Sequence, residues 1–91
     1  MYEIRFTSRA SREFRQLTPK IQERLAMAVD RISDNPRQPG IIKLKGQRQV
    51  YRIRVGDWRV IYQIVDKDNL IFVGKIAHRS KGTYSDLEEL F

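Results

Sequence analysis

The chain has 91 residues and a formal net charge of +7, because eighteen Lys and Arg residues stand against eleven Asp and Glu residues. This length allows one domain, residues 1–91, with a single core and no spare volume for a deep cavity, so any active site should be a surface groove. The absence of cysteine excludes disulfides and thiolate metal sites, and with one histidine we expect neither a metal site nor a cofactor. The N-terminus is unlike a signal peptide and no run can span a bilayer, so we expect a cytoplasmic protein.

The basic charge is concentrated in one quarter of the chain. Residues 37–59 hold seven basic side chains and one acidic side chain, which gives +6 of the net charge. Such a block favours an anionic partner, with nucleic acid first among the candidates. On charge alone, a solvated basic face that only aids solubility is an equal alternative.

The first half of the chain predicts a strand followed by two helices. Residues 2–6 alternate apolar and polar side chains, which is typical of a strand with one buried face. Thr7 or Ser8 can then cap a helix whose apolar positions follow the i, i+4, i+7 spacing. Thr18 followed by Pro19 starts a second amphipathic helix, which an Asn-Pro pair ends. We therefore expect a two-helix hairpin.

The second half predicts strands. Three runs are rich in β-branched and aromatic residues, over residues 50–55, 58–65 and 70–77, and the first alternates from Tyr51 onward. Gly56-Asp57 supplies a two-residue hairpin turn, and a capping box at residues 85–88 predicts a short C-terminal helix. The fold class is therefore α+β: an N-terminal strand and a two-helix hairpin on a small, mainly antiparallel, twisted sheet, with a short C-terminal helix.

The predicted hairpin register brings two arginines face to face. A turn at Gly56-Asp57 places Arg54 opposite Arg59 and puts Arg52 on the same side of the sheet, while the apolar residues face the helices. Like charges in direct cross-strand positions destabilise a sheet by a few tenths to about 1 kcal/mol. A phosphate held between the arginines would reverse the sign of this interaction. The register favours a phosphate-binding face over splayed, solvated arginines.

The face on which the third strand presents His78 and Arg79 depends on its register. Pairing Val65 with Leu70 directly puts His78 on the arginine side, whereas polarity suggests that Lys75 and Arg79 are the solvated residues. A bulge at Gly74, or a longer loop, would reconcile the two.

These residues resemble a known family. The run YRIRVGDWRVIY at residues 51–62, IAHR at residues 76–79 and Tyr84 are similar to the C-terminal half of RelE-type toxins of bacterial toxin–antitoxin pairs. The strand and two helices match the RelE/ParE layout, so the resemblance covers nearly all of the chain. It implies a RelE-like microbial RNase fold. It also implies a ribosome-dependent endoribonuclease that cleaves mRNA in the A site by attack of the 2′-hydroxyl, without a metal.

The resemblance also implies a catalytic set. Arg59 and Arg79 match arginines that stabilise the scissile phosphate, and Tyr84 matches the tyrosine that orients the substrate or stacks on it. Arg52 and Arg54 fall where the family's best-known member has lysines. Because arginine stays protonated, Arg54 is a poor general base, but it can stabilise charge that develops on the phosphorane oxygens.

His78 is the best candidate for proton transfer, since its ordinary pKa of about 6.5 suits either direction near neutrality. The alternative, slightly favoured, is that it stacks on a base or contacts phosphate. Further RNA or ribosome contacts are expected from the remaining basic residues nearby: Arg37, Lys43, Lys45, Arg48, Arg52, Lys75 and Lys81.

The expected partners are the ribosome, mRNA and a cognate antitoxin, and the complex of toxin and antitoxin can lie on operator DNA. The antitoxin should cover the basic groove or displace the helix over residues 85–91. The apolar Leu87, Leu90 and Phe91 fit a mobile, partner-dependent element or a helix packed on the core. Two other functions stay open: a ParE-like inhibitor of DNA gyrase, and a non-catalytic RNA-binding and antitoxin-binding co-repressor.

Overall fold

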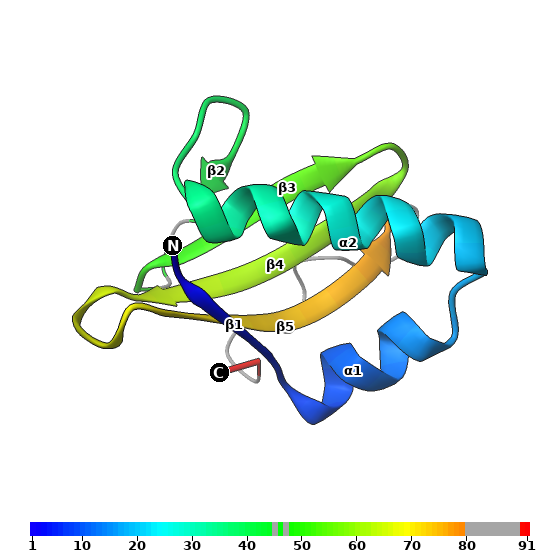
Figure 1. Ribbon diagram of the computed structural model, residues 1–91, viewed down its shortest axis with the longest axis horizontal. Coiled ribbons are helices and arrows are strands. Elements are labelled where there is room, and N and C mark those ends of the chain that lie inside the picture. Colours follow the sequence, from blue (N-terminus) through cyan, green and yellow to red (C-terminus); the bar gives the residue numbers. More distant parts are fainter. Residues whose placement is uncertain (45, 47, 80–89) are drawn as a thin grey trace.

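The computed structural model describes residues 1–44, 46, 48–79 and 90–91. In these ranges, two helices pack on one face of a twisted five-stranded sheet (Figure 1). The elements are β1 (Glu3–Phe6), α1 (Ser8–Arg15), α2 (Pro19–Asp34), β2 (Ile42–Lys43), β3 (Val50–Val55), β4 (Trp58–Val65), a 3-10 turn η1 (Asp66–Asp68) and β5 (Leu70–His78). The strand order is β1-β5-β4-β3-β2, and only β1 and β5 run parallel. The predicted α+β class and the mainly antiparallel sheet are confirmed, whereas the predicted C-terminal helix lies outside the described residues.

Both helices begin at the predicted caps. The Thr7 hydroxyl accepts a hydrogen bond from the Ala10 amide at 3.2 Å, and the Thr18 hydroxyl accepts one from the Ile21 amide at 3.4 Å. These bonds satisfy amides that have no partner inside the helix, and Pro19 has no amide hydrogen to satisfy. No helix in the described ranges is both long and apolar enough to cross a membrane.

The β3–β4 hairpin has the predicted register. Val55 pairs with Trp58 and Arg54 with Arg59, so the turn contains two residues. Gly56 has a φ of +61°, while Asp57 is not among the residues with positive φ, as a type II′ turn requires. The turn therefore fixes which side chains of the two strands share a face.

A bulge at Gly74 shifts the pairing of β4 with β5. Val65 pairs with Leu70 as predicted, but Tyr62 pairs with Val73 and Ile61 with Lys75, so Gly74 has no partner on β4. The residues beyond it move by one position relative to β4. The interpretation that placed a bulge at Gly74 is correct.

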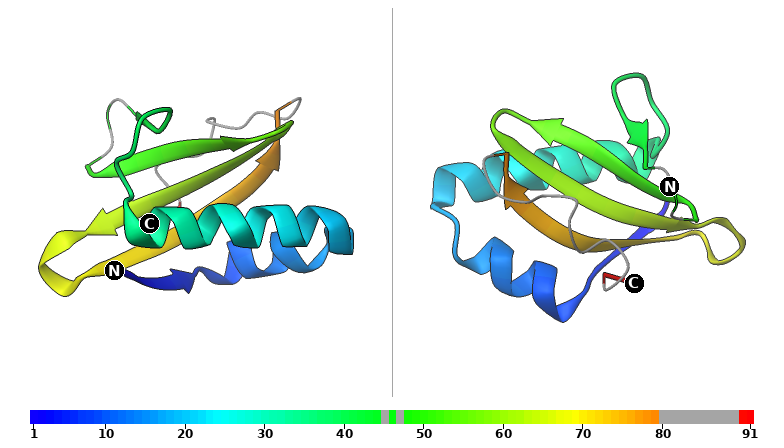
Figure 2. Two further views of the ribbon diagram at one scale, coloured as in Figure 1. Left: turned by 45° about the horizontal axis from the view of Figure 1, so that its top comes forward. Right: turned by 180° about the vertical axis from the view of Figure 1, so that it is seen from behind.

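The sheet buries both of its faces. Both helices lie on one side of the sheet (Figure 2). This helix-covered face carries the main core, in which Leu25, Ile32, Val60 and Tyr62 are almost fully buried. The opposite face, called here the outer face, carries the arginine side of the hairpin and a second apolar cluster of Leu44, Val50, Ile61 and Leu90. Leu90 is thus packed, whereas Phe91 is 43% exposed.

Candidate nucleic-acid interface

The opposed arginines lie at the hairpin end of the outer face and diverge from one another. One guanidinium nitrogen of Arg59 donates to the carbonyl oxygens of Gly56 at 3.1 Å and Trp58 at 2.9 Å, so this side chain folds back over the turn. Arg54 is exposed and reaches the rim between β3 and α2. Their cross-strand repulsion is reduced by this divergence, and both keep donors for an anion.

Arg79 follows the last residue of β5 and lies at the same hairpin end as Arg54 and Arg59. Its amide donates to the carbonyl of Asp57 at 2.8 Å, and its Nε lies 3.4 Å from an Asp57 carboxylate oxygen. Both side chains are more than 60% exposed, so the ion pair contributes little to stability. A phosphate can therefore replace Asp57 at little energetic cost.

His78 lies on the other side of the strand. The bulge pairs it with Trp58, and the two rings meet edge to face with centroids 5.3 Å apart. Trp58 packs against the core on the helix-covered face. By strand alternation, it is Arg79 and not His78 that points to the arginine side.

Two basic residues of the outer face are buried, contrary to expectation. Lys75 is 5% exposed, so the prediction that it is solvated is wrong. Arg52 is 6% exposed, and its Nε has no hydrogen-bond partner among the described residues. Both lie beside the apolar cluster that includes Leu90, which returns from the far end of the chain to this face. Neither side chain is open to RNA in this arrangement.

The remaining predicted RNA contacts are spread out. Lys43 is exposed on the short edge strand β2, and Arg48 lines a polar hollow of about 450 Å³ at the opposite end of the sheet from the turn. Arg48 lies in the turn before Val50, the first residue of β3. Val50 and Arg54 are four residues apart along that strand, which corresponds to about 13 Å. Lys45, Lys81 and Tyr84 lie outside the described residues.

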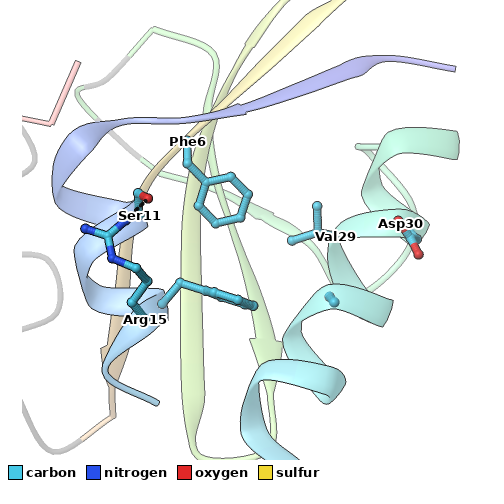
Figure 3. Close-up of a pocket in the computed structure, with 7 residues that line it drawn as sticks. Phe6, Ser11, Arg15, Val29 and Asp30 are labelled. Atoms are coloured by element: carbon cyan, nitrogen blue, oxygen red, sulfur yellow. Dashed lines mark hydrogen bonds between the residues drawn. The ribbon is translucent and has the colours of Figure 1, made fainter. Parts of the chain in front are cut away.

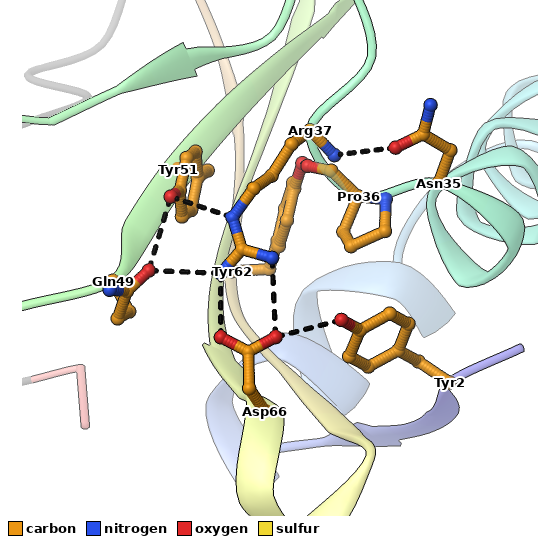
Figure 4. A network of polar contacts seen from close by, with 8 residues as sticks. All are labelled: Tyr2, Asn35, Pro36, Arg37, Gln49, Tyr51, Tyr62 and Asp66. Atoms are coloured by element: carbon orange, nitrogen blue, oxygen red, sulfur yellow. Dashed lines mark hydrogen bonds and ion pairs between the residues drawn. The ribbon is translucent and has the colours of Figure 1, made fainter.

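Arg37 is committed to a polar network at that opposite end (Figure 4). Its guanidinium donates to both carboxylate oxygens of Asp66, at 3.2 and 2.8 Å, to the Tyr51 hydroxyl at 3.1 Å and to Gln49 Oε1 at 3.0 Å. The Tyr2 hydroxyl donates to the same carboxylate at 2.7 Å. Gln49 has a φ of +55°, a strained value for this residue that the two hydrogen bonds to its side chain help to hold. The structure therefore does not bring Arg37 to the hairpin end.

The network makes stability depend on pH. Hydrogen bonds from Arg37 and then Tyr2 lower the pKa of Asp66 below its ordinary value of 3.8. A carboxyl group with a lowered pKa stabilises the fold above its unfolded pKa, and this contribution is lost as pH falls through the folded pKa.

We expect Asp66→Asn to lower the urea midpoint at pH 7, and the difference from the unmodified chain to shrink as pH falls from about 5 towards 2. Asp68→Asn removes the same charge from the same turn and serves as the control, with little expected change. A difference that stays constant over this pH range would contradict the assignment.

A second hollow, between α1 and α2, is apolar. It measures about 400 Å³, and Phe6 points into it opposite Val29, with Arg15 and Asp30 at its rim (Figure 3). It brings together no residue of the predicted catalytic set.

Comparison with known proteins places this geometry in a family. Residues 4–82 match the model of the ParE toxin of type II toxin–antitoxin systems, and the chain belongs to this toxin family. The chain is 28% identical to the mRNA interferase toxin RelE of Escherichia coli strain K12 over 93% of its own length and 92% of that protein. The resemblance to RelE/ParE toxins is therefore confirmed.

Solved structures show the same fold. The isolated RelE toxin of E. coli matches with a TM-score of 0.80 and 26% identity, over 98% of this chain and 97% of that chain. RelE in the intact E. coli RelBE toxin–antitoxin complex matches with a TM-score of 0.78 and 28% identity, over 86% of this chain and 96% of that chain.

Proposed function

We propose that this chain is the toxin of a type II toxin–antitoxin pair and cleaves mRNA on the ribosome. The observation that carries the proposal is the hairpin end of the outer face, which gathers three arginines: the exposed Arg54 and Arg79 and the half-buried Arg59. The family match and the relative named as an mRNA interferase support the choice of RNA as substrate. The reaction is attack of a 2′-hydroxyl on the adjacent phosphate, with no metal. The 2′-oxygen loses its proton and bonds to phosphorus, while the bond from phosphorus to the 5′-oxygen of the next nucleotide breaks and that oxygen takes up a proton.

The arginines supply charge stabilisation. In this attack, negative charge grows on the phosphate oxygens, and positioned guanidinium groups stabilise it more in the transition state than in the ground state. Arg79 is the most available, since its one described side-chain partner is the exposed Asp57 carboxylate. Arg59 still has donors beyond those used on the turn carbonyls. None of the three accepts a proton, because arginine stays charged.

Proton transfer therefore requires a side chain other than these three arginines. His78 carries an imidazole, a common acid–base group, but this ring faces Trp58, across the strand from the arginines. We therefore propose that His78 acts at the rim of the site, where a base or phosphate contact is open to it. Tyr84 is proposed to orient the substrate.

The partner of the toxin is proposed to be a cognate antitoxin. The solved complex of RelE with its antitoxin supports this assignment. A net charge of +7 favours an acidic segment in that partner.

The name of the matching family favours one alternative, inhibition of DNA gyrase. Brief induction in cells, followed by mapping of RNA 5′ ends, separates the two. We expect new 5′ ends within translated reading frames, which disappear from a transcript whose start codon has been removed. Intact mRNA together with cleaved chromosomal DNA would overturn the proposal in favour of gyrase.

A further inference from the structure

A basic hollow lies between α2 and the β3–β4 hairpin. It measures about 300 Å³ and is lined by Arg24, Met27, Arg31, Arg54, Val55 and Gly56. Strand β2 pairs only with Tyr51 and Arg52 of β3. Residues 53–55 of β3 therefore form an open edge beside α2, and the hollow lies at this edge. Arg24, Met27 and Arg31 are three or four residues apart on α2 and share one exposed stripe of that helix.

The hollow carries uncompensated positive charge. Three of its lining residues are arginines and none is acidic. Elsewhere, this chain pairs arginines with carboxylates, as in Arg5–Glu3, Arg9–Glu13, Arg37–Asp66 and Arg79–Asp57. Within the described ranges, the side chains of Arg24, Arg31 and Arg54 form no hydrogen bond or ion pair. An anion is the partner that this surface lacks.

Arg24 is placed by the hairpin turn. A Cβ atom at Gly56 would lie 2.7 Å from a terminal nitrogen of Arg24, so the guanidinium lies directly against the turn. On the same turn, Arg59 donates to the Gly56 carbonyl. The hairpin turn thus lies between two guanidinium groups, one from the helix and one from the outer face.

Arg54 connects the two surfaces. It lines the hollow and is the cross-strand neighbour of Arg59 on the outer face. A polyanion bound at the hairpin end can therefore continue round the open edge of β3 to Arg31 and Arg24. One guanidinium group can bind two phosphate oxygens at once, and the exposed Met27 offers apolar contact to a ribose or base.

We infer that this hollow is a second phosphate-binding site, which holds the RNA backbone next to the cleavage site. The inference rests on the proposed function and adds a contact outside the predicted catalytic set. RNA is favoured over an acidic protein segment because the hollow shares Arg54 with the hairpin end. The phosphate can come from mRNA or from ribosomal RNA.

The test is the salt dependence of RNA binding by the full chain. The double variant Arg24→Gln/Arg31→Gln is compared with Arg12→Gln/Lys67→Gln, which removes two exposed positive charges elsewhere. Affinity for a short labelled single-stranded RNA, and separately for vacant ribosomes, is measured from about 50 to about 200 mM KCl. Each lost phosphate contact lowers the log–log salt slope by about 0.7 on a single strand, so we expect the first variant to lose about 1.4 and the control almost nothing.

The two arms identify the source of the phosphate. A lower slope with the free oligonucleotide assigns mRNA, and one with vacant ribosomes assigns ribosomal RNA. Equal slopes for both variants in both arms would overturn the inference, as would weaker antitoxin binding with unchanged RNA slopes. Arg31→Gln alone, with Arg31→Lys as the charge-preserving comparison, tests the site if the double variant unfolds. If the unmodified toxin cleaves mRNA and the slopes are equal, only this inference fails; changed slopes without cleavage would refute only the proposed function.

Discussion

Replacing both Arg59 and Arg79 by alanine is expected to abolish growth arrest on induction. Loss of a single positioned donor in the transition state costs about 10²–10³ in rate, so the double variant should cleave mRNA at least about 10³-fold more slowly. The readout is single-turnover cleavage on programmed ribosomes, together with the 5′ ends that appear in induced cells. Full toxicity of this variant would exclude the proposed mechanism.

The control must separate lost chemistry from lost charge and lost folding. Arg5→Ala/Arg12→Ala removes two exposed arginines from the N-terminal half and should leave cleavage within a few-fold of the unmodified toxin. Because Arg59 also binds the turn carbonyls, thermal unfolding of each variant is compared first. A folded but inactive Arg59→Ala/Arg79→Ala protein is the expected outcome.

Leu25→Ala is expected to cause the largest loss of stability. Leu25 is 1% exposed in the core between α2 and the sheet, and comparable leucine truncations cost about 2.7–5 kcal/mol. A change of 1 kcal/mol moves the Tm of a domain this small by about 4–8 °C. A fall in Tm of at least about 10 °C should therefore appear in circular dichroism melting curves.

Met27→Ala is the matched control, two residues along the same helix. Met27 is 57% exposed, so its truncation should change the free energy of unfolding by no more than about 0.5 kcal/mol. Similar effects of the two substitutions would contradict the burial of this face of α2.

The features of the fold that were predicted correctly depend on residues close together in the sequence. Thr7, Thr18 and Pro19 fixed the helix starts because capping involves only neighbouring residues. The two-residue turn fixed the pairing of Arg54 with Arg59, since a hairpin has one register once its turn is known. The short β2 strand escaped prediction because two exposed residues carry no readable periodicity.

The surroundings of several basic side chains could not be predicted, because residues distant in the sequence pack against them. Arg37 was assigned to RNA, but its partner Asp66 lies 29 residues away. Arg52 and Lys75 were read as lying on an open face, whereas Leu90 packs on that side. Neither Arg24 nor Arg31 was singled out from the sequence, because no local pattern indicates that helix α2 and the hairpin turn line one hollow.

The bulge at Gly74 shifts the pairing of the rest of β5 with β4 by one residue. Side chains alternate between the faces of a strand, so one unpaired residue exchanges the orientation of every residue after it. Without it, strict pairing would turn the imidazole of His78 towards Arg54 and Arg59 and turn Arg79 towards the core. One residue without a side chain thus decides whether an imidazole or a guanidinium group shares the outer face with Arg54 and Arg59. Within this fold, insertion or deletion of a single residue near position 74 is expected to exchange His78 and Arg79 on the arginine side of the sheet while both side chains are kept.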